Sequence, residues 1–367
     1  MAQKPIAVLG ATGYTGRLIV RELQRRQVPV LAAARSRTKL QELATNLGAL
    51  DLIETDVRDP AALERLARRS AVIINTVGPF ADLGEPVVQA AITHGAHYLD
   101  TTGEQPFVRA MMAYDERARE QGVAVVPAQA FEIAVADCAA SVAAEGFRDV
   151  GTIQITYRTR FHASQGTQRT VLRMLQRPGQ VYAGRKWMEE RLAQHVRAVN
   201  FPSPVGRVAA VSFPGAEIIT IPHHLTVREV RTFMSLPPIA ARVISATAPI
   251  LQALLRSPLS RVFNGIIGTG TDGPDEATRA HDEFHIAIDV RGVRAGAACH
   301  RRLLAHGHDP YGLTAVLAAR GAEWLCGDNF DRSGVLAPAA AFDPPAVLEH
   351  VRQFGLTYEI REESGRS

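Results

Sequence analysis

The chain contains 367 residues, a length that suits two domains, each large enough to bury its own core. Hydrophobic residues make up 46% and charged residues 21%, which is a globular composition and excludes a mainly disordered chain. The net charge of +4 comes from basic residues scattered along the sequence, so we expect no nucleic-acid partner.

The first predicted strand, Pro5–Gly10, runs straight into a glycine-rich turn that opens an amphipathic helix. Glycines stand at three-residue spacing at Gly10, Gly13 and Gly16, a pattern that in this strand–turn–helix context is typical of dinucleotide-binding domains. Gly10 would permit the sharp turn, Gly13 would let the backbone approach a pyrophosphate, and Gly16 would allow close packing. The helix N-terminus would then offer free N–H groups to the phosphates.

Strand and helix patterns alternate from residue 5 to about residue 128. This alternation predicts an α/β fold with a Rossmann-type, doubly wound parallel sheet that binds ligands at the carboxyl ends of its strands. After the first strand, the predicted strands are Val28–Ala34, Asp51–Glu54, Ala71–Val77, His97–Asp100 and Val123–Pro127.

Basic residues follow the second predicted strand, at Arg35, Arg37 and Lys39. An acidic side chain at this place accepts the ribose 2′-hydroxyl of NAD, whereas an arginine can pair with the 2′-phosphate of NADP. The cluster therefore favours NADP (NADPH) as the cofactor. After the third strand, Asp56 and Val57 could flank the adenine, although Asp56 could equally cap the next helix.

Beyond residue 150 the strands alternate apolar and polar residues, as in an antiparallel sheet with one covered face. We therefore expect a second, α+β domain with a mostly antiparallel sheet. An apolar stretch, Ile239–Leu255, is too short to span a membrane, and Pro249 predicts a break or kink in it. It suits a buried helix, an oligomer contact or the wall of a substrate site. The predicted strands here are Thr152–Phe161, Val208–Phe213, Ala216–Ile221 and Phe284–Val290.

These patterns divide the chain into three parts. Residues 1–129 are the predicted dinucleotide-binding Rossmann domain, and residues 130–308 are the α+β substrate domain. Residues 309–367 contain two predicted helices, Asp309–Leu325 and Pro344–Phe354, and a last strand near Thr357–Ile360. We expect all of these C-terminal elements to pack back on the Rossmann domain.

Six segments, spread in order over almost the whole chain, resemble the saccharopine-dehydrogenase-like oxidoreductases, which include saccharopine reductases and bacterial trans-acting enoyl reductases. They read GATGYTG from Gly10, NTVGPF from Asn75, YLDTTGE from Tyr98, GPDEATRA from Gly273, DPYGLTA from Asp309 and GVLAPAAAFDP from Gly334. The resemblance implies that the first loop, the VGP turn and the TGE turn line a nicotinamide dinucleotide. It assigns to the cofactor site Gly10, Ala11, Thr12, Gly13, Tyr14, Thr15, Gly16, Val77, Gly78, Pro79, Phe80 and Thr102.

The resemblance breaks down after the sixth strand. Relatives commonly read GFDSxPSD there, whereas this chain reads AFEIAVAD over residues 130–137. The serine and the proline are missing, but acidic groups remain at Glu132 and Asp137. This departure concerns the substrate more than the cofactor.

A carbon that receives a hydride also needs a proton donor, and our candidates are His162, Tyr157 and Glu104. His162 ends an alternating strand and precedes a loop similar to one that faces the cofactor cleft in the family. Histidine is a common general acid near neutral pH, although a histidine at a strand end is often structural.

Two groups of histidines might hold a metal ion in principle, His223 with His224 and His306 with His308. No acid or cysteine completes a recognisable ligand set beside either group in the sequence. We therefore expect no metal site.

Together these patterns predict an NADPH-dependent oxidoreductase that reduces an enoyl group in an acyl thioester, polyketide or lipid by hydride transfer. One alternative is saccharopine-reductase-like reduction of an amino-acid-derived imine, for which Arg158, Arg160 and Glu132 could serve. Another is a non-catalytic NADP-binding sensor or scaffold.

The expected partner is a small-molecule substrate, which an acyl carrier could present to the scattered surface arginines. The apolar stretch would also suit a homodimer. Because the chain passes from Met1 into the first strand with no apolar signal region, we expect a cytoplasmic protein that is not an integral membrane protein.

Overall fold

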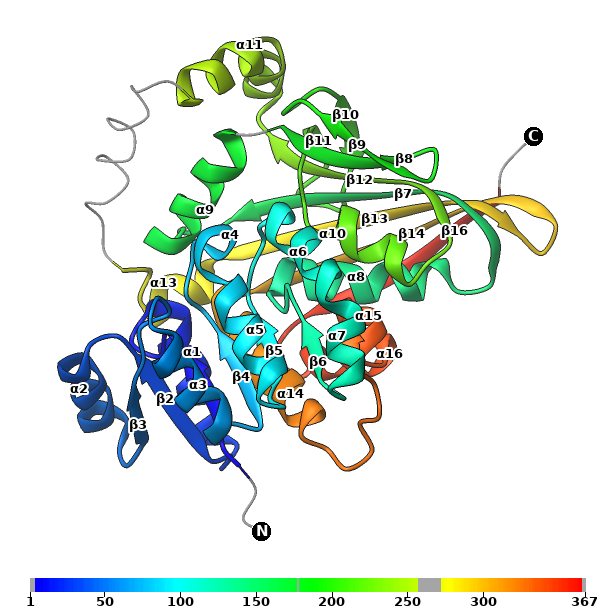
Figure 1. Ribbon diagram of the computed structural model, residues 1–367. Helices are drawn as coiled ribbons and strands as arrows, with labels where there is room; N and C mark the ends of the chain where they lie inside the picture. The colour runs from blue at the N-terminus through cyan, green and yellow to red at the C-terminus, as the bar shows by residue number, and fades with distance from the viewer. Residues whose placement is uncertain (1–3, 177, 257–271, 365–367) are drawn as a thin grey trace. The chain divides into compact units, whose positions relative to one another are not determined.

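The computed structural model describes residues 4–176, 178–256 and 272–364, which form two compact units (Figure 1). The first unit comprises the chain up to Ala134 together with Tyr311–Asp343. The second comprises Val135–Pro310 together with the chain from Pro344 onward. The chain therefore leaves the first unit, returns to it once, and ends in the second.

A seven-stranded parallel sheet lies at the centre of the first unit and confirms the predicted Rossmann-type fold. Its strands are short apolar runs that are largely buried, as expected when helices cover both faces. The order reverses at β1, so the glycine loop lies beside the point where such sheets bind nucleotides. In spatial order they are β15 (Gly334–Val335), β6 (Ala124–Val126), β5 (His97–Asp100), β4 (Val72–Asn75), β1 (Ile6–Leu9), β2 (Val30–Ala34) and β3 (Asp51–Glu54).

The helices of this unit follow the strands in alternation. Asp59 caps one of them by accepting a hydrogen bond from the Ala61 N–H at 2.9 Å, and Pro60 occupies its first turn. The helices are α1 (Tyr14–Arg25), α2 (Arg37–Leu47), α3 (Pro60–Arg69), α4 (Phe80–Leu83), α5 (Glu85–Thr93), α6 (Gln105–Met111), η1 (Met112–Tyr114), α7 (Asp115–Glu120), the start of α8 (Phe131–Ala144), α14 (Pro310–Leu325) and α15 (Pro338–Ala341).

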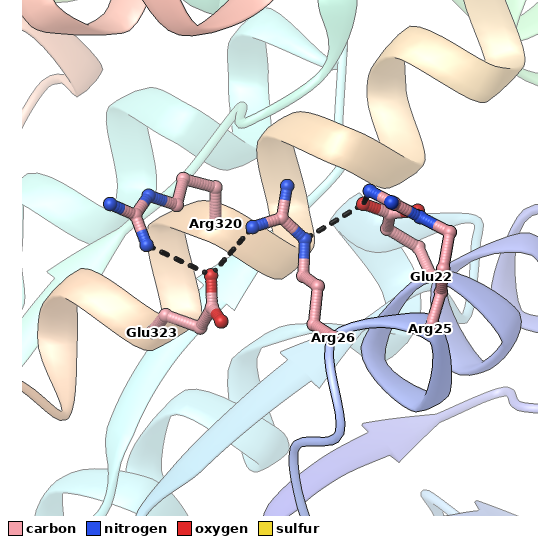
Figure 2. Close-up of polar contacts among 5 residues, drawn as sticks. All are labelled: Glu22, Arg25, Arg26, Arg320 and Glu323. Atoms are coloured by element: carbon pink, nitrogen blue, oxygen red, sulfur yellow. Dashed lines mark hydrogen bonds and ion pairs between the residues drawn. The ribbon is translucent and has the colours of Figure 1, made fainter.

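Ion pairs attach the returning helix α14 to α1 within the first unit (Figure 2). Arg26, directly after α1, donates to Glu22 at 2.7 Å and to Glu323 of α14 at 2.9 Å. Glu323 also accepts from Arg320 at 3.3 Å, and Arg25 pairs with Glu22 at 2.8 Å. Because the Arg26 and Glu22 side chains are largely buried, water screens these charges less than it would at the surface.

A nine-stranded, mostly antiparallel sheet forms the second unit, which confirms the predicted second fold. Strands β12 and β7 run parallel, and the other neighbours in the sheet run antiparallel. In spatial order the main path is β10 (Val196–Asn200), β11 (Arg207–Phe213), β12 (Val227–Leu236), β7 (Phe147–Arg160), β13 (Glu283–Arg294), β14 (Ala297–His308) and β16 (Thr357–Ser364), and the hairpin β8 (Gly179–Ala183) and β9 (Lys186–Glu190) joins β12. The helices are α9 (Gln165–Gln176), α10 (Glu217–Thr220), η2 (Ile221–His223), α11 (Pro238–Arg256), α13 (Glu276–His281) and α16 (Pro344–Arg352).

Two expectations about this unit were wrong. The segment Ala216–Ile221 is not a strand but contains helix α10 and the first residue of η2, because six residues with three isoleucines suit a buried helical turn as well as a strand. Helix α11 also continues through Pro249 without a break. Pro249 cannot donate to the Ser245 carbonyl, and that oxygen accepts from Arg191 at 3.4 Å.

The predicted C-terminal part, residues 309–367, also needs correction. Only Tyr311–Asp343 joins the first unit, where β15 pairs with β6. From Pro344 the chain belongs to the second unit, where β16 pairs with β14 over eight residues, from Cys299↔Ser364 to His306↔Thr357. An apolar helix followed by a strand carries no local sign of which sheet it extends.

Candidate functional site

The glycine loop after β1 has the geometry that a bound diphosphate needs. Gly10 has φ = +88°, a conformation that favours glycine, and its carbonyl accepts from the Gly13 N–H at 2.8 Å. A Cβ atom on Gly16 would lie 2.1 Å from the Gly10 carbonyl oxygen, so the start of α1 packs directly on the loop. Among the described residues no side chain caps α1 at Gly13, which leaves this helix end open to an anion.

The other residues of this loop are fixed by their surroundings. Ala11 is fully buried, while Thr12, Tyr14 and Thr15 are partly exposed. Arg17 donates to the Thr12 carbonyl at 2.9 Å and holds the loop from the first turn of the helix. The Arg17 side chain thus holds the backbone of the loop that would meet a phosphate.

The VGP turn after β4 is held by polar groups from the strand ends. Asn75 accepts from the Val77 N–H at 3.0 Å, and the Thr76 hydroxyl donates to the Leu9 carbonyl at 2.9 Å. Gly78 is exposed, whereas Phe80 is buried in the core. This turn therefore presents backbone beside the glycine loop, because β4 and β1 are neighbours.

Glu104 supports the VGP turn from the neighbouring strand. Its two carboxylate oxygens accept from the N–H groups of Phe80 at 3.0 Å and Ala81 at 2.9 Å, at the start of α4. The buried Thr102 hydroxyl accepts from the Glu104 N–H at 3.0 Å, and Asp100 accepts from the Thr102 N–H at 2.9 Å. These contacts favour a positioning role for Glu104 over the predicted role of proton donor.

A different carboxyl group has the properties of an acid near neutral pH. Glu132 lies in the first turn of α8, and a Cβ atom on Gly103 of the TGE turn would be 3.6 Å from its Oε1 atom. Burial raises the pKa of Glu132 to about 7. The sequence marked Glu132 as an acid that remains in a divergent segment, but only the fold shows that it adjoins the TGE turn.

The adenine end of the site carries exposed positive charge. Arg35, Arg37 and Lys39 follow β2 and are exposed, with Ser36 capping α2 through the Lys39 N–H at 3.3 Å. Asp56 accepts from the Arg58 N–H at 2.9 Å, and Val57 is a member of the core. The structure therefore gives Asp56 and Val57 structural contacts, while Arg35 and its neighbours remain available to a phosphate group.

The DPYGLTA segment enters the same unit from Tyr311 onward, in the part of the chain that was expected to pack back on the Rossmann domain. The Tyr311 ring meets the Tyr14 ring of the glycine loop edge-on, with centroids 4.9 Å apart. The Thr314 hydroxyl accepts from the Phe131 N–H at 3.1 Å, directly before Glu132. The return of the chain to the first unit thus supports both the loop and the start of α8.

The two remaining predicted proton donors lie in the second unit. His162 is 72% exposed, and its Nδ1 atom lies 2.8 Å from Asp282, which also accepts from the His162 N–H at 3.1 Å. Tyr157 is buried, and its hydroxyl donates to Glu217. Both side chains thus have carboxylate partners, and their catalytic role stays a prediction.

A buried polar cluster in the second unit was not anticipated. The His224 Nε2 atom lies 3.0 Å from Asp137, which also accepts from the Thr220 hydroxyl at 2.7 Å. Burial alone would lower the pKa of His224, but attraction to the Asp137 carboxylate outweighs it and the pKa is raised. Asp137 is the second acid of the divergent segment, and these contacts give it a structural partner.

The apolar stretch forms helix α11, and much of its apolar surface is exposed. Ile239 is 80% and Ile250 72% exposed, and Val243 and Leu254 lie on the same face of the helix. Ala241 and Ala248 face a small core instead. Within the described residues, no helix is long and apolar enough to cross a bilayer.

Comparison with known proteins identifies the first unit. Residues 6–126 match the family model described as the saccharopine dehydrogenase NADP binding domain. The resemblance read from the sequence is thus confirmed for this part of the chain, and NADP is the cofactor of this domain.

Curated relatives agree with this assignment. The human saccharopine dehydrogenase-like oxidoreductase is 35% identical over 156 residues, which are 37% of this chain and 36% of that protein. The lipid droplet localized protein of Caenorhabditis elegans is 35% identical over 150 residues, or 37% and 35%. The trans-acting enoyl reductase of Mycobacterium ulcerans is 36% identical over 134 residues, or 35% and 32%. The chain therefore spans about a third of the length of these relatives.

Proposed function

We propose that the protein is an NADPH-dependent reductase of the saccharopine-dehydrogenase-like type, acting on an enoyl thioester with a hydrophobic acyl chain. The observation that carries this proposal is Glu132, an acid with a pKa of about 7 beside the TGE turn of the NADP-binding unit. Reduction of a polarised double bond requires a hydride and a proton. In this proposal NADPH provides the hydride and Glu132 provides the proton.

Different residues of the first unit would bind the cofactor and position the turns around it. The glycine loop and the N-terminus of α1 would hold the diphosphate of the cofactor, and Arg35, Arg37 and Lys39 would contact its 2′-phosphate. Bound NADPH supplies the hydride. Glu104 and Asn75 hold the VGP turn in place through backbone N–H groups.

Glu132 completes the reaction as the proton donor. Hydride addition to the β-carbon of an enoyl thioester leaves negative charge on the α-carbon and the thioester oxygen. The Glu132 carboxyl gives its proton to the α-carbon and is left as a carboxylate, which regains a proton from water. A pKa near 7 keeps a substantial protonated fraction at neutral pH, as a general acid needs.

Two features favour an acyl chain over an amino-acid-derived imine. Helix α11 exposes an apolar face, and burying such surface contributes about 25 cal/mol per Å² to binding. The arginines suggested for an imine substrate, Arg158 and Arg160, lie 3.0 and 3.8 Å from Glu283, so a carboxylate already engages them. The relative from Mycobacterium ulcerans carries the name of an enoyl reductase.

Single-turnover oxidation of NADPH tests the proposal. We expect oxidation with 2-enoyl thioesters, at rates that rise with acyl chain length, and none with imines formed from lysine and 2-oxoglutarate. Glu132→Gln should bind NADPH normally but reduce the thioester at least tenfold more slowly, whereas Glu120→Gln, an exposed control, should match the natural protein. Oxidation with the imines alone would show an imine reductase. Tight NADPH binding without oxidation by either class would show a sensor or scaffold.

A further inference from the structure

Strand pairing in the second unit brings together three side chains that the sequence keeps apart. Strands β13 and β14 are antiparallel, with His285 directly opposite His306. Glu283 lies two residues before His285 and therefore points to the same face of the sheet. One ligand atom from each of these three residues lies within 4.8 Å of the other two. Glu283 thus provides, from the opposite strand of the hairpin, the acidic ligand that is missing beside His306 in the sequence.

We propose that Glu283, His285 and His306 form a binding site for a divalent transition-metal ion, with zinc as the best fit. Two imidazoles and one carboxylate are ligands that zinc and cobalt accept, whereas magnesium and calcium prefer oxygen ligands alone. Three protein ligands leave a fourth position for water or for His308, whose ring centroid lies 4.8 Å from that of His306.

The spacing is close to what a tetrahedral ion needs. Metal–ligand bonds of about 2.1 Å place neighbouring ligand atoms roughly 3.4 Å apart. The three atoms, which lie within 4.8 Å of one another, must therefore approach by up to about 1.4 Å. Glu283 and His306 are partly exposed and can rotate, whereas Phe201 contacts the His285 ring at 5.9 Å between centroids and holds it.

The two imidazoles are prepared to act as ligands. Their rings stack with centroids 4.4 Å apart and an angle of 24° between planes, an arrangement that two protonated rings would resist. The His285 Nε2 atom is buried and, among the described residues, has no hydrogen-bond partner.

The carboxylate is oriented by an arginine. Arg158 donates to Glu283 Oε1 at 3.0 Å, while Oε2 lies 4.0 Å from His285 Nε2. Arg158 can therefore keep Oε1 while Oε2 turns to the metal, as groups outside the ligand set commonly do. The charges of Arg158 and Arg160 oppose a cation, so we expect moderate affinity rather than that of a zinc finger.

Cobalt titration of the full-length, chelator-treated protein tests this site. We expect one equivalent of Co²⁺ to produce visible absorption bands that Zn²⁺ removes, and Zn²⁺ but not Mg²⁺ to raise the melting temperature. Glu283→Gln and His306→Gln should each weaken Co²⁺ binding at least tenfold. Both residues are partly exposed, so these variants should fold, which circular dichroism checks.

Two other histidine–carboxylate pairs provide matched controls. His162 contacts Asp282 at 2.8 Å and His300 contacts Asp289 at 2.7 Å, each with one histidine only. His162→Gln and His300→Gln should leave Co²⁺ binding unchanged. Absence of saturable Co²⁺ binding, or binding that persists in both Glu283→Gln and His306→Gln, would overturn the proposal. The stacked His285 and His306 rings would then have a structural role only.

Discussion

Replacing Glu132 by glutamine should change how the stability of the protein depends on pH. Burial raises the pKa of Glu132 from 4.5 to about 7 in the folded protein. Because the folded state binds a proton that the unfolded chain releases, the stability contributed by the neutral carboxyl is fully present below pH 4.5 and is lost as the pH rises through 7. A pKa difference of about 2.5 corresponds to about 3 kcal/mol.

Chemical denaturation at pH 5 and pH 8 measures this effect. Glutamine cannot ionise, so between these pH values the natural protein should lose about 2 to 3 kcal/mol relative to Glu132→Gln. Other groups that titrate, such as Asp100, whose pKa burial raises to about 7, are common to both proteins and cancel in the difference. Glu120→Gln, at an exposed position of α7, should follow the natural protein.

Parallel stability curves for the natural protein and Glu132→Gln would refute the reasoning, since the carboxyl would then ionise equally in the folded and unfolded states. The same variant separates stability from chemistry. If Glu132 donates the proton, turnover by the natural protein should fall as the pH rises above about 7. If the two proteins differ in stability but turnover does not fall above pH 7, Glu132 ionises as predicted but takes no part in the reaction.

Four further outcomes are expected. Arg35→Asp should lose an NADPH preference of at least tenfold over NADH, measured by calorimetric titration, and equal affinities in the natural protein would remove the 2′-phosphate assignment. Gly13→Val should fold but bind NADPH poorly, because the valine side chain would take the space of the pyrophosphate. Gly16→Ala should instead destabilise the first unit, since its Cβ atom would lie 2.1 Å from the Gly10 carbonyl oxygen. Circular dichroism measures folding and titration measures NADPH binding, so together they distinguish the two variants. A double-mutant cycle of Arg26→Ala and Glu323→Ala should show a coupling energy of about 1 kcal/mol in denaturation, and additive effects would mean that the pair of Figure 2 does not hold α14. Ile250→Ser should alter stability by less than about 0.5 kcal/mol but raise KM for long-chain thioesters; an unchanged KM would remove α11 from substrate binding.

Most of the first unit could be predicted from the sequence because its elements up to β6 carry local signals, whereas the two-residue strand β15 was not predicted. Strands such as Asp51–Glu54 and His97–Asp100 are short apolar or β-prone runs bounded by turns, and they occur where they were predicted. The conformation of Gly10 and the close packing at Gly16 follow from the spacing of the glycines. Regular alternation of strands and helices then determines a parallel sheet.

The second unit shows where local patterns stop being informative. Ala216–Ile221 was predicted as a strand because its apolar and polar residues were read as alternating, but six residues are too few to distinguish a strand from a helical turn. The pairing of β16 with β14 depends on a contact between segments more than fifty residues apart. In the same way His285 and His306 meet only through the register of a hairpin, so a ligand set that includes Glu283 could not be seen as a sequence motif.

Two glutamates near the TGE turn show why the proton donor could not be identified from residue type alone. Glu104 is buried and Glu132 is partly buried, and both lie after neighbouring strands of the parallel sheet. Glu104 accepts hydrogen bonds from two backbone N–H groups, and these contacts hold the start of α4. For Glu132, burial instead favours the neutral form and raises its pKa to about 7. The surroundings of each carboxyl group, rather than its place in a motif, therefore favour Glu132 over Glu104 as the candidate proton donor.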